Sequence, residues 1–160
     1  MVTHPIRWRP SMAVDGGLID DDHRHLIDLV NSFQGHDERG GPSLSQAVDC
    51  LNALKFYAET HFTREERLQA LVSYPEHRDQ QAEHREIMGV LDDLIWRAEH
   101  TVTDGDIATI VEHLAQLLRR WLLNHIIAHD LRMKPYAAAM RQHATDLPAL
   151  KSLRPAPACS

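Results

Sequence analysis

An uninterrupted stripe of residues spaced alternately by four and three positions most constrains the fold of this chain. Its members are Ala47, Leu51, Leu54, Ala58, His61, Glu65, Leu68 and Val72. Because this spacing keeps side chains on one face of an α-helix, we predict a helix from about Ser43 to Val72 that buries the stripe. His61 and Glu65 then point inward, one turn apart. A buried carboxylate is costly unless a cation meets it, so a metal ion is the first candidate partner.

Three further segments show the same helical periodicity. They are predicted to run from about Asp20 to Phe33, from Pro75 to the residues before Thr103, and from about Asp106 to Pro135. No segment shows the apolar and polar alternation of a strand, and the connections are short. The chain is therefore predicted to be all-α and to form an up-down-up-down antiparallel four-helix bundle.

The predicted bundle occupies only part of the chain. We assign residues 1–18 to an N-terminal arm, 19–136 to the bundle and 137–160 to a C-terminal extension. The arm contains a Gly16-Gly17 turn. The extension is rich in proline and alanine, and we predict an irregular, loosely attached tail.

Composition restricts the partners and the compartment. The net charge is -6 and no Lys/Arg cluster stands out, so we expect neither nucleic acid nor membrane as a partner. The two cysteines, Cys50 and Cys159, form no C-x-x-C pattern, which favours a reducing compartment. The first ten residues contain no apolar run, and no stretch is long and apolar enough to span a membrane, so we expect no leader segment and a cytoplasmic protein. One bundle consumes all the apolar stripes, which favours a monomer.

Each predicted helix brings polar residues to its apolar face. They are His23 on the first, His61 and Glu65 on the second, Gln80 and His84 on the third, and His125 with nearby Asp130 on the fourth. One inward histidine is usually an ordinary core residue, but four helices with such residues favour a metal site. Four imidazoles and two carboxylates exceed what one tetrahedral zinc needs and suit two bridged ions, with iron the first choice. The alternative is a metal-free structural bundle.

Four motifs are the basis of a family resemblance across residues 6–136. They are Trp8 and Val14 with Ile19-Asp20-x-x-His23-x-x-Leu26, then His61-Phe62-x-x-Glu65-Glu66, then Tyr74-Pro75 leading to His84, and Trp121-Leu122-x-x-His125-Ile126-x-x-x-Asp130. No Glu-x-x-His motif of the ferritin-like bundles occurs. Together the four motifs resemble the hemerythrin family, specifically the bacterial hemerythrins.

The resemblance implies a non-haem di-iron centre, Fe2+ or Fe3+, with a bridging oxo or hydroxo group. Glu65 and Asp130 would bridge the irons. His23 and His61 would bind one iron, and His84 and His125 the other. The side chains expected to line an O2 pocket are Leu26, Phe62, Trp121 and Ile126. The implied function is O2 binding for carriage, storage, delivery or sensing, and a sensing role requires a separate recipient or signalling protein.

One position departs from the family pattern. The third family segment carries two histidines four residues apart, and here the first of them is Gln80. This glutamine could offer its amide oxygen to iron, hydrogen-bond a water or leave a coordination position open. An open position would favour an enzyme acting on peroxide or nitric oxide. His77 is not expected to replace the missing ligand, because it lies about 10 Å along the helix from His84.

The spacing of the last motif needs a local irregularity. His125 and Asp130 are five residues apart, which separates their directions by about 140° on a regular α-helix. His129, four residues after His125, is the more natural partner by this geometry alone. A single π-type turn would swing Asp130 inward, and such turns are frequent at functional sites. We follow the family pattern and choose Asp130.

Overall fold

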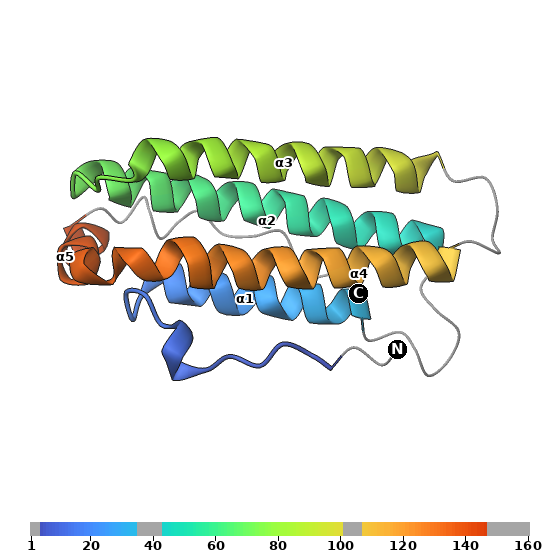
Figure 1. The fold of residues 1–160 in the computed structure, drawn as a ribbon, viewed down its shortest axis with the longest axis horizontal. Helices are drawn as coiled ribbons and strands as arrows, with labels where there is room; N and C mark the ends of the chain where they lie inside the picture. Colours follow the sequence, from blue (N-terminus) through green and yellow to red (C-terminus); the bar gives the residue numbers. More distant parts are fainter. Residues whose placement is uncertain (1–3, 35–42, 101–106, 147–160) are drawn as a thin grey trace.

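The computed structural model describes residues 4–34, 43–100 and 107–146 (Figure 1). Its helices are α1 (Leu18–Gln34), α2 (Leu44–Leu71), α3 (His77–Glu99), α4 (Ile107–Asn124) and α5 (Ala137–Asp146). A π-helical turn (His125–His129) and a 3-10 segment (Asp130–Tyr136) join α4 to α5, and a short 3-10 turn (Pro10–Met12) precedes α1. Helices α1 to α4 lie side by side and alternate in direction (Figure 1). The predicted all-α four-helix bundle is confirmed.

Local sequence signals explain where the helices begin. Ser43 and Gln46 form a reciprocal capping box at the start of α2, where the Ser43 side chain accepts from the Gln46 N–H and the Gln46 side chain accepts from the Ser43 N–H. Helix α1 begins at Leu18, two residues earlier than predicted. The Asp15 carboxylate accepts hydrogen bonds from backbone N–H groups in the first turn of α1, including that of Ile19. This cap extends the helix toward the arm.

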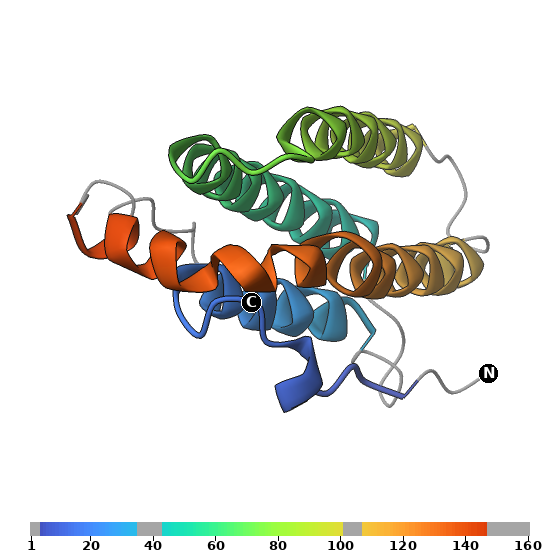
Figure 2. The ribbon, with the colours of Figure 1, turned by 60° about the vertical axis from the view of Figure 1, so that its left-hand side comes forward.

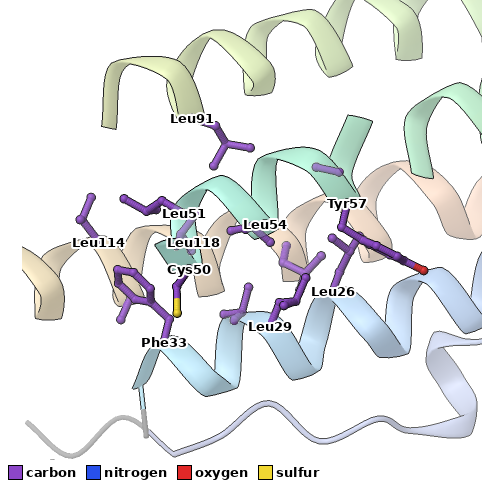
Figure 3. Packing of buried hydrophobic residues seen from close by; sticks show 14 of the residues in the cluster. Leu26, Leu29, Phe33, Cys50, Leu51, Leu54, Tyr57, Leu91, Leu114 and Leu118 are labelled. Carbon is purple, nitrogen blue, oxygen red and sulfur yellow. The ribbon is translucent and has the colours of Figure 1, made fainter. Parts of the chain in front are cut away.

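The apolar core forms two clusters along the bundle axis. The larger cluster contains leucines from all four bundle helices, among them Leu26, Leu51, Leu91 and Leu118 (Figure 3). Burying a leucine contributes about 1.5 to 3 kcal/mol, so this cluster is the main source of stability. The smaller cluster closes the other end of the bundle and comprises Val14, Ile19, Leu68, Tyr74, Met133, Met140 and Ala144. On α1, His23 lies between Ile19 of the smaller cluster and Leu26 of the larger one, and on α2, Glu65 lies between Phe62 and Leu68.

The C-terminal extension differs in part from the prediction of an irregular tail. Residues Ala137–Asp146 form α5, which crosses the end of the bundle (Figures 1 and 2). Alanine-rich sequence has high helix propensity, and Pro135 lies just before α5, where proline is tolerated. Met140 is fully buried against the smaller cluster. The remaining predicted tail, residues 147–160, lies outside the described residues.

The N-terminal arm packs against the bundle. Met12 belongs to the larger core cluster, and Trp8 packs against it. The Asn31 side chain exchanges two hydrogen bonds with the backbone of Ile6, each 2.8 Å long. Among the described residues, no helix is both long enough and apolar enough to cross a membrane.

Candidate metal centre

The six predicted ligands lie together inside the bundle. His23, His61, Glu65, His125 and Asp130 offer ligand atoms that all lie within 4.8 Å of one another. His84 joins this group through Glu65, because its Nε2 lies 3.5 Å from Glu65 Oε1. The most exposed of the six is His84, at 2%. Four helical segments distant in sequence therefore bring four imidazoles and two carboxylates to one buried position.

Each carboxylate stands between imidazoles from different helices. Glu65 directs Oε2 toward His61 Nε2 at 3.3 Å and Oε1 toward His84 Nε2 at 3.5 Å. Asp130 Oδ2 lies 2.9 Å from both His23 Nε2 and His125 Nε2. Because the two oxygens of Glu65 face different histidines, its carboxylate is oriented as a bridge between two cations would be.

A π-helical turn brings Asp130 into this group. The expected turn is present at His125–His129, where the Asp130 N–H donates to the carbonyl of His125, five residues earlier. The additional residue in the turn rotates Asp130 to the side of the helix that His125 faces. His129 points elsewhere: its side chain is 32% exposed and its Nδ1 lies 3.3 Å from Glu83.

Carboxylates outside the ligand group face the Nδ1 side of three imidazoles and hydrogen-bond two of them. Asp22 Oδ2 lies 3.3 Å from His61 Nδ1, and Glu66 Oε1 lies 2.7 Å from His84 Nδ1. Glu83 Oε1 faces His125 Nδ1 at 3.6 Å. A carboxylate on Nδ1 fixes the ring and leaves Nε2 for a metal, an arrangement typical of metal-binding histidines.

Asp22 and Glu83 were not singled out in the sequence, although the periodicity contains a signal for both. Asp22 lies three residues after Ile19 and four before Leu26, so it falls on the inward edge of the first stripe. Glu83 is four residues before Ile87 on the third stripe. Glu66 directly follows Glu65 in the second motif, and its carboxylate contacts His84 Nδ1.

The pKa of Asp22 reflects its partners. Burial raises the pKa of this carboxyl, but its contacts with His61 and then with Arg64 lower the pKa to about 2. The Tyr57 hydroxyl also donates to Asp22 Oδ1 over 2.7 Å. Burial and the neighbouring Asp22 raise the pKa of Tyr57 well above its ordinary value. Asp22 therefore stays ionised inside the protein.

Unsatisfied polar atoms indicate that the six residues fit a cation. The buried atoms without a hydrogen bond include Nε2 of His23, His61, His84 and His125, Glu65 Oε2 and Asp130 Oδ2. Buried polar atoms are nearly always hydrogen-bonded, so a convergent set of exceptions needs an explanation. Imidazole nitrogens together with carboxylate oxygens are suitable ligands for iron and other transition metals.

The pKa shifts of Asp130 and His125 agree with a cation-binding site. Burial raises the pKa of Asp130, yet the neighbouring His125 and His23 lower it well below its ordinary range. Burial lowers the pKa of His125, but the Asp130 carboxylate raises it well above its ordinary value. The carboxylate is thus stabilised by positive charge, which a bound cation would also supply.

Gln80 is buried beside Asp130. Its Nε2 donates to Asp130 Oδ1 over 3.0 Å, and its Oε1 accepts from Gln69. Gln69, four residues after Glu65 on the same helix face, is a buried residue that the sequence reasoning missed. His77 Nδ1 lies 3.0 Å from Gln69 Oε1. His77 therefore contacts Gln69 and is not one of the six residues that form the group.

Aromatic side chains form one wall of the group. The Phe62 ring stacks on His84 with centroids 3.9 Å apart, and the Trp121 ring stacks on His125 with centroids 5.8 Å apart. Leu26 and Ile126 are fully buried in the adjacent core cluster, whereas Trp121 is partly buried. A groove between α3 and α4 is lined in part by Trp121, Glu83 and His129.

A four-helix bundle with imidazoles and carboxylates converging in its interior defines a class of helical cation-binding proteins. The family model described as the hemerythrin HHE cation-binding domain matches residues 17–137. The chain therefore belongs to the hemerythrin family, as the sequence motifs predict.

Curated relatives resemble the chain over most of its length. A bacteriohemerythrin of Methylococcus capsulatus is 30% identical over 123 residues, which cover 77% of this chain and 88% of the relative. A bacteriohemerythrin of Pseudomonas aeruginosa is 26% identical over 140 residues, covering 88% and 84% of the two chains. A hemerythrin-like protein of Naegleria gruberi is 25% identical over 133 residues, covering 83% and 94%.

Proposed function

We propose that this protein holds two iron ions, linked by an oxo or hydroxo bridge, and binds O2 at this site. The observation that carries the proposal is a set of six buried nitrogen and oxygen atoms without hydrogen bonds, in residues of which five have ligand atoms within 4.8 Å of one another. Support also comes from the family, whose matching model is described as cation-binding, and from relatives named bacteriohemerythrin.

We assign His23 and His61 to one iron and His84 and His125 to the other. Glu65 and Asp130 would bridge the two irons. The assignment follows the family pattern and agrees with the two directions in which the Glu65 oxygens point. Two ferrous ions at this site would supply the electrons that O2 binding requires.

The surrounding side chains control access to the site. Leu26, Phe62 and Ile126 are buried and apolar, and they exclude water and bulk anions. Trp121 stacks on His125 and lines the groove that separates α3 from α4. Exclusion of water favours reversible binding over release of an oxidant. We expect carriage, storage, delivery or sensing by a cytoplasmic monomer, with a separate recipient or signalling protein where binding is sensed.

A second candidate is an enzyme acting on peroxide or nitric oxide. The observation that favours it is Gln80, which supplies no imidazole at a position where the family pattern has one. Gln80→His should restore that donor and change both the visible spectrum of the ferric protein and its binding of small ligands. An unchanged spectrum together with unchanged ligand binding would show that position 80 has no influence on reactivity.

Iron analysis and one spectroscopic cycle test the proposal. Protein reconstituted with ferrous iron should contain two irons per chain, and removal of O2 from the oxygenated sample should restore the ferrous spectrum. Rapid irreversible oxidation would exclude a carrier and favour the enzyme. Less than one iron per chain after reconstitution would favour the metal-free structural bundle.

A further inference from the structure

Two buried glutamines adjoin the six proposed ligands without belonging to the ligand set. Gln69 on α2 is fully buried and Gln80 on α3 is 2% exposed. A primary amide carries two donor hydrogens and one acceptor oxygen, and burial requires that these find partners. The direction in which each amide donates therefore determines what it can offer a metal.

Both amides donate toward the carboxylates. Gln69 Nε2 lies 2.9 Å from Glu65 Oε1 and donates to it. The same nitrogen donates to Gln80 Oε1, and Gln80 Nε2 donates to Asp130 Oδ1 over 3.0 Å. His77 Nδ1, 3.0 Å from Gln69 Oε1, engages the oxygen end of this amide and so directs its amino end inward. The oxygens of both glutamines already serve as acceptors.

We propose that Gln80 is a positioning residue and not a metal ligand. Together, Gln69 and Gln80 form an amide clasp, a hydrogen-bonded pair that connects Glu65 to Asp130. The inference rests on the proposed function in one respect, that these two carboxylates bridge two cations. Hydrogen bonds to ligating carboxylates fix their orientation and favour their ionised form.

Coordination by Gln80 would require the clasp to break. Its oxygen can face a metal only if the amide turns over, which removes the hydrogen bond to Asp130 and sets two amino groups, those of Gln69 and Gln80, against each other. Each buried donor left unpaired costs about 1 to 3 kcal/mol. A neutral amide oxygen is also a less suitable ligand for iron than imidazole is. The clasp therefore keeps its direction when metal binds.

The clasp specifies what kind of ligand the site can take. The metal held by His84 and His125 lacks a protein donor at position 80, so both metals keep two imidazoles each. A small diatomic ligand could then occupy the unfilled position. Phe62 and Trp121 stack on His84 and His125, the two imidazoles proposed for the same metal.

A double-mutant cycle in two states of the protein tests the clasp. The thermal midpoint is measured for the unaltered chain, Gln69→Leu, Gln80→Leu and the double variant, each metal-free and each loaded with zinc. Each single change should lower the midpoint by roughly 3 to 8 °C, because it leaves a buried partner unsatisfied. The double variant should fall by less than the sum of the two single effects, because the hydrogen bond between Gln69 and Gln80 is then lost only once.

Additive effects in the zinc-loaded protein would overturn the proposal, since they would place the Gln80 oxygen on the metal instead of on Gln69. Additive effects in the metal-free protein would show that no clasp exists. Gln116→Leu on α4 is the matched control, because the Gln116 side chain donates to Glu112 on the surface of the same helix and its effect should add to each clasp variant in both states. A chain that binds neither zinc nor iron would refute the proposed function, while the metal-free cycle would still report on the clasp.

A measurement on the unaltered protein covers the case in which a leucine variant does not fold. In 15N-labelled protein, the Gln80 side-chain amide protons should show nuclear Overhauser contacts to the Asp130 methylene both before and after zinc is added. Loss of these contacts on zinc binding would mean that the amide has turned toward the metal, and the proposal would be wrong.

Discussion

At the residue scale, Asp22 supports the site without being one of its proposed ligands. It accepts a hydrogen bond from Tyr57, pairs with Arg64 and contacts His61 Nδ1. This last contact holds the His61 ring so that Nε2 faces the interior. The folded-state pKa of Asp22 is about 2, so the carboxylate is ionised at neutral pH.

Asp22 gives the metal-free protein a defined acid sensitivity. Its folded pKa of about 2 lies below the value of about 3.9 in an unfolded chain, so the unfolded state binds the proton first. Its contribution of roughly 2 kcal/mol is fully present above about pH 4 and is lost as the pH falls toward 2. Urea unfolding of metal-free protein at a series of pH values measures this contribution. As the pH falls, the free energy of unfolding should decrease less in Asp22→Asn than in the unaltered protein. Asp93→Asn, at an exposed site, is the control. An equal dependence of the free energy of unfolding on pH in Asp22→Asn and in the unaltered protein would contradict the prediction.

At the element scale, one π-helical turn determines the direction of Asp130. The turn accommodates one residue more than an α-helical turn, and Ile127 within it is 55% exposed. Five residues after His125, Asp130 thus takes the direction that the fourth residue has on a regular helix. The π turn is short. A regular α-helix, α4, precedes it, and the 3-10 segment follows directly.

Deleting Ile127 should therefore keep metal binding. A regular helix in the deletion variant still places the aspartate on the side of His125, now four residues away. Inserting an alanine after Ile127 should turn the aspartate by about 100° and abolish binding of the second metal. Zinc stoichiometry by competition with a chelator distinguishes the variants. A folded deletion variant without bound zinc would show that the π turn itself is required.

Helix α5 is the second element with a measurable role. Met140 is fully buried where α5 crosses the end of the bundle. Met140→Ala should destabilise the protein by about 2 to 4 kcal/mol, because it leaves a cavity in a closed cluster. The thermal midpoint should fall by roughly 5 to 10 °C. The exposed Gln142→Ala on the same helix is the control, and equal midpoints for the two variants would mean that α5 contributes little to stability.

At the scale of the whole molecule, the site separates two apolar clusters and weakens the metal-free fold. On α1 the order is Ile19, His23, Leu26, so apolar residues flank the polar group on both sides. The atoms left without hydrogen bonds include oxygens of Glu65 and Asp130. Buried carboxylates without sufficient partners reduce stability, and metal binding therefore couples to folding.

Loading the site with metal should raise the thermal midpoint. At about one hundred times the Kd, a ligand that binds only the folded state stabilises it by about 2.7 kcal/mol, or roughly 5 to 10 °C here. Scanning calorimetry with ferrous iron or zinc measures this shift. Magnesium, which prefers oxygen ligands, is the control and should have little effect. An equal midpoint with and without iron would count against burial of the carboxylates at a metal site.

Much of the fold was predictable because helical periodicity is local. The stripe from Ala47 to Val72 sets which face of α2 is buried, and four such stripes define the bundle. The inward direction of His23, His61 and His84 follows from the same periodicity. Helix α5 was missed because its prediction depended on proline and alanine composition, whereas its burial depends on the bundle end that it crosses.

By itself, the sequence determined the helical class, the family and the six residues that face one another. Only the tertiary structure decided their supporting contacts: Asp22 against His61, Glu83 beside His125, and the clasp between Gln69 and Gln80. Periodicity tells which side of a helix a residue faces, but not which residue of another helix stands at the same height. That depends on how the helices pack along their axes, and the direction of an amide depends on all of its neighbours at once.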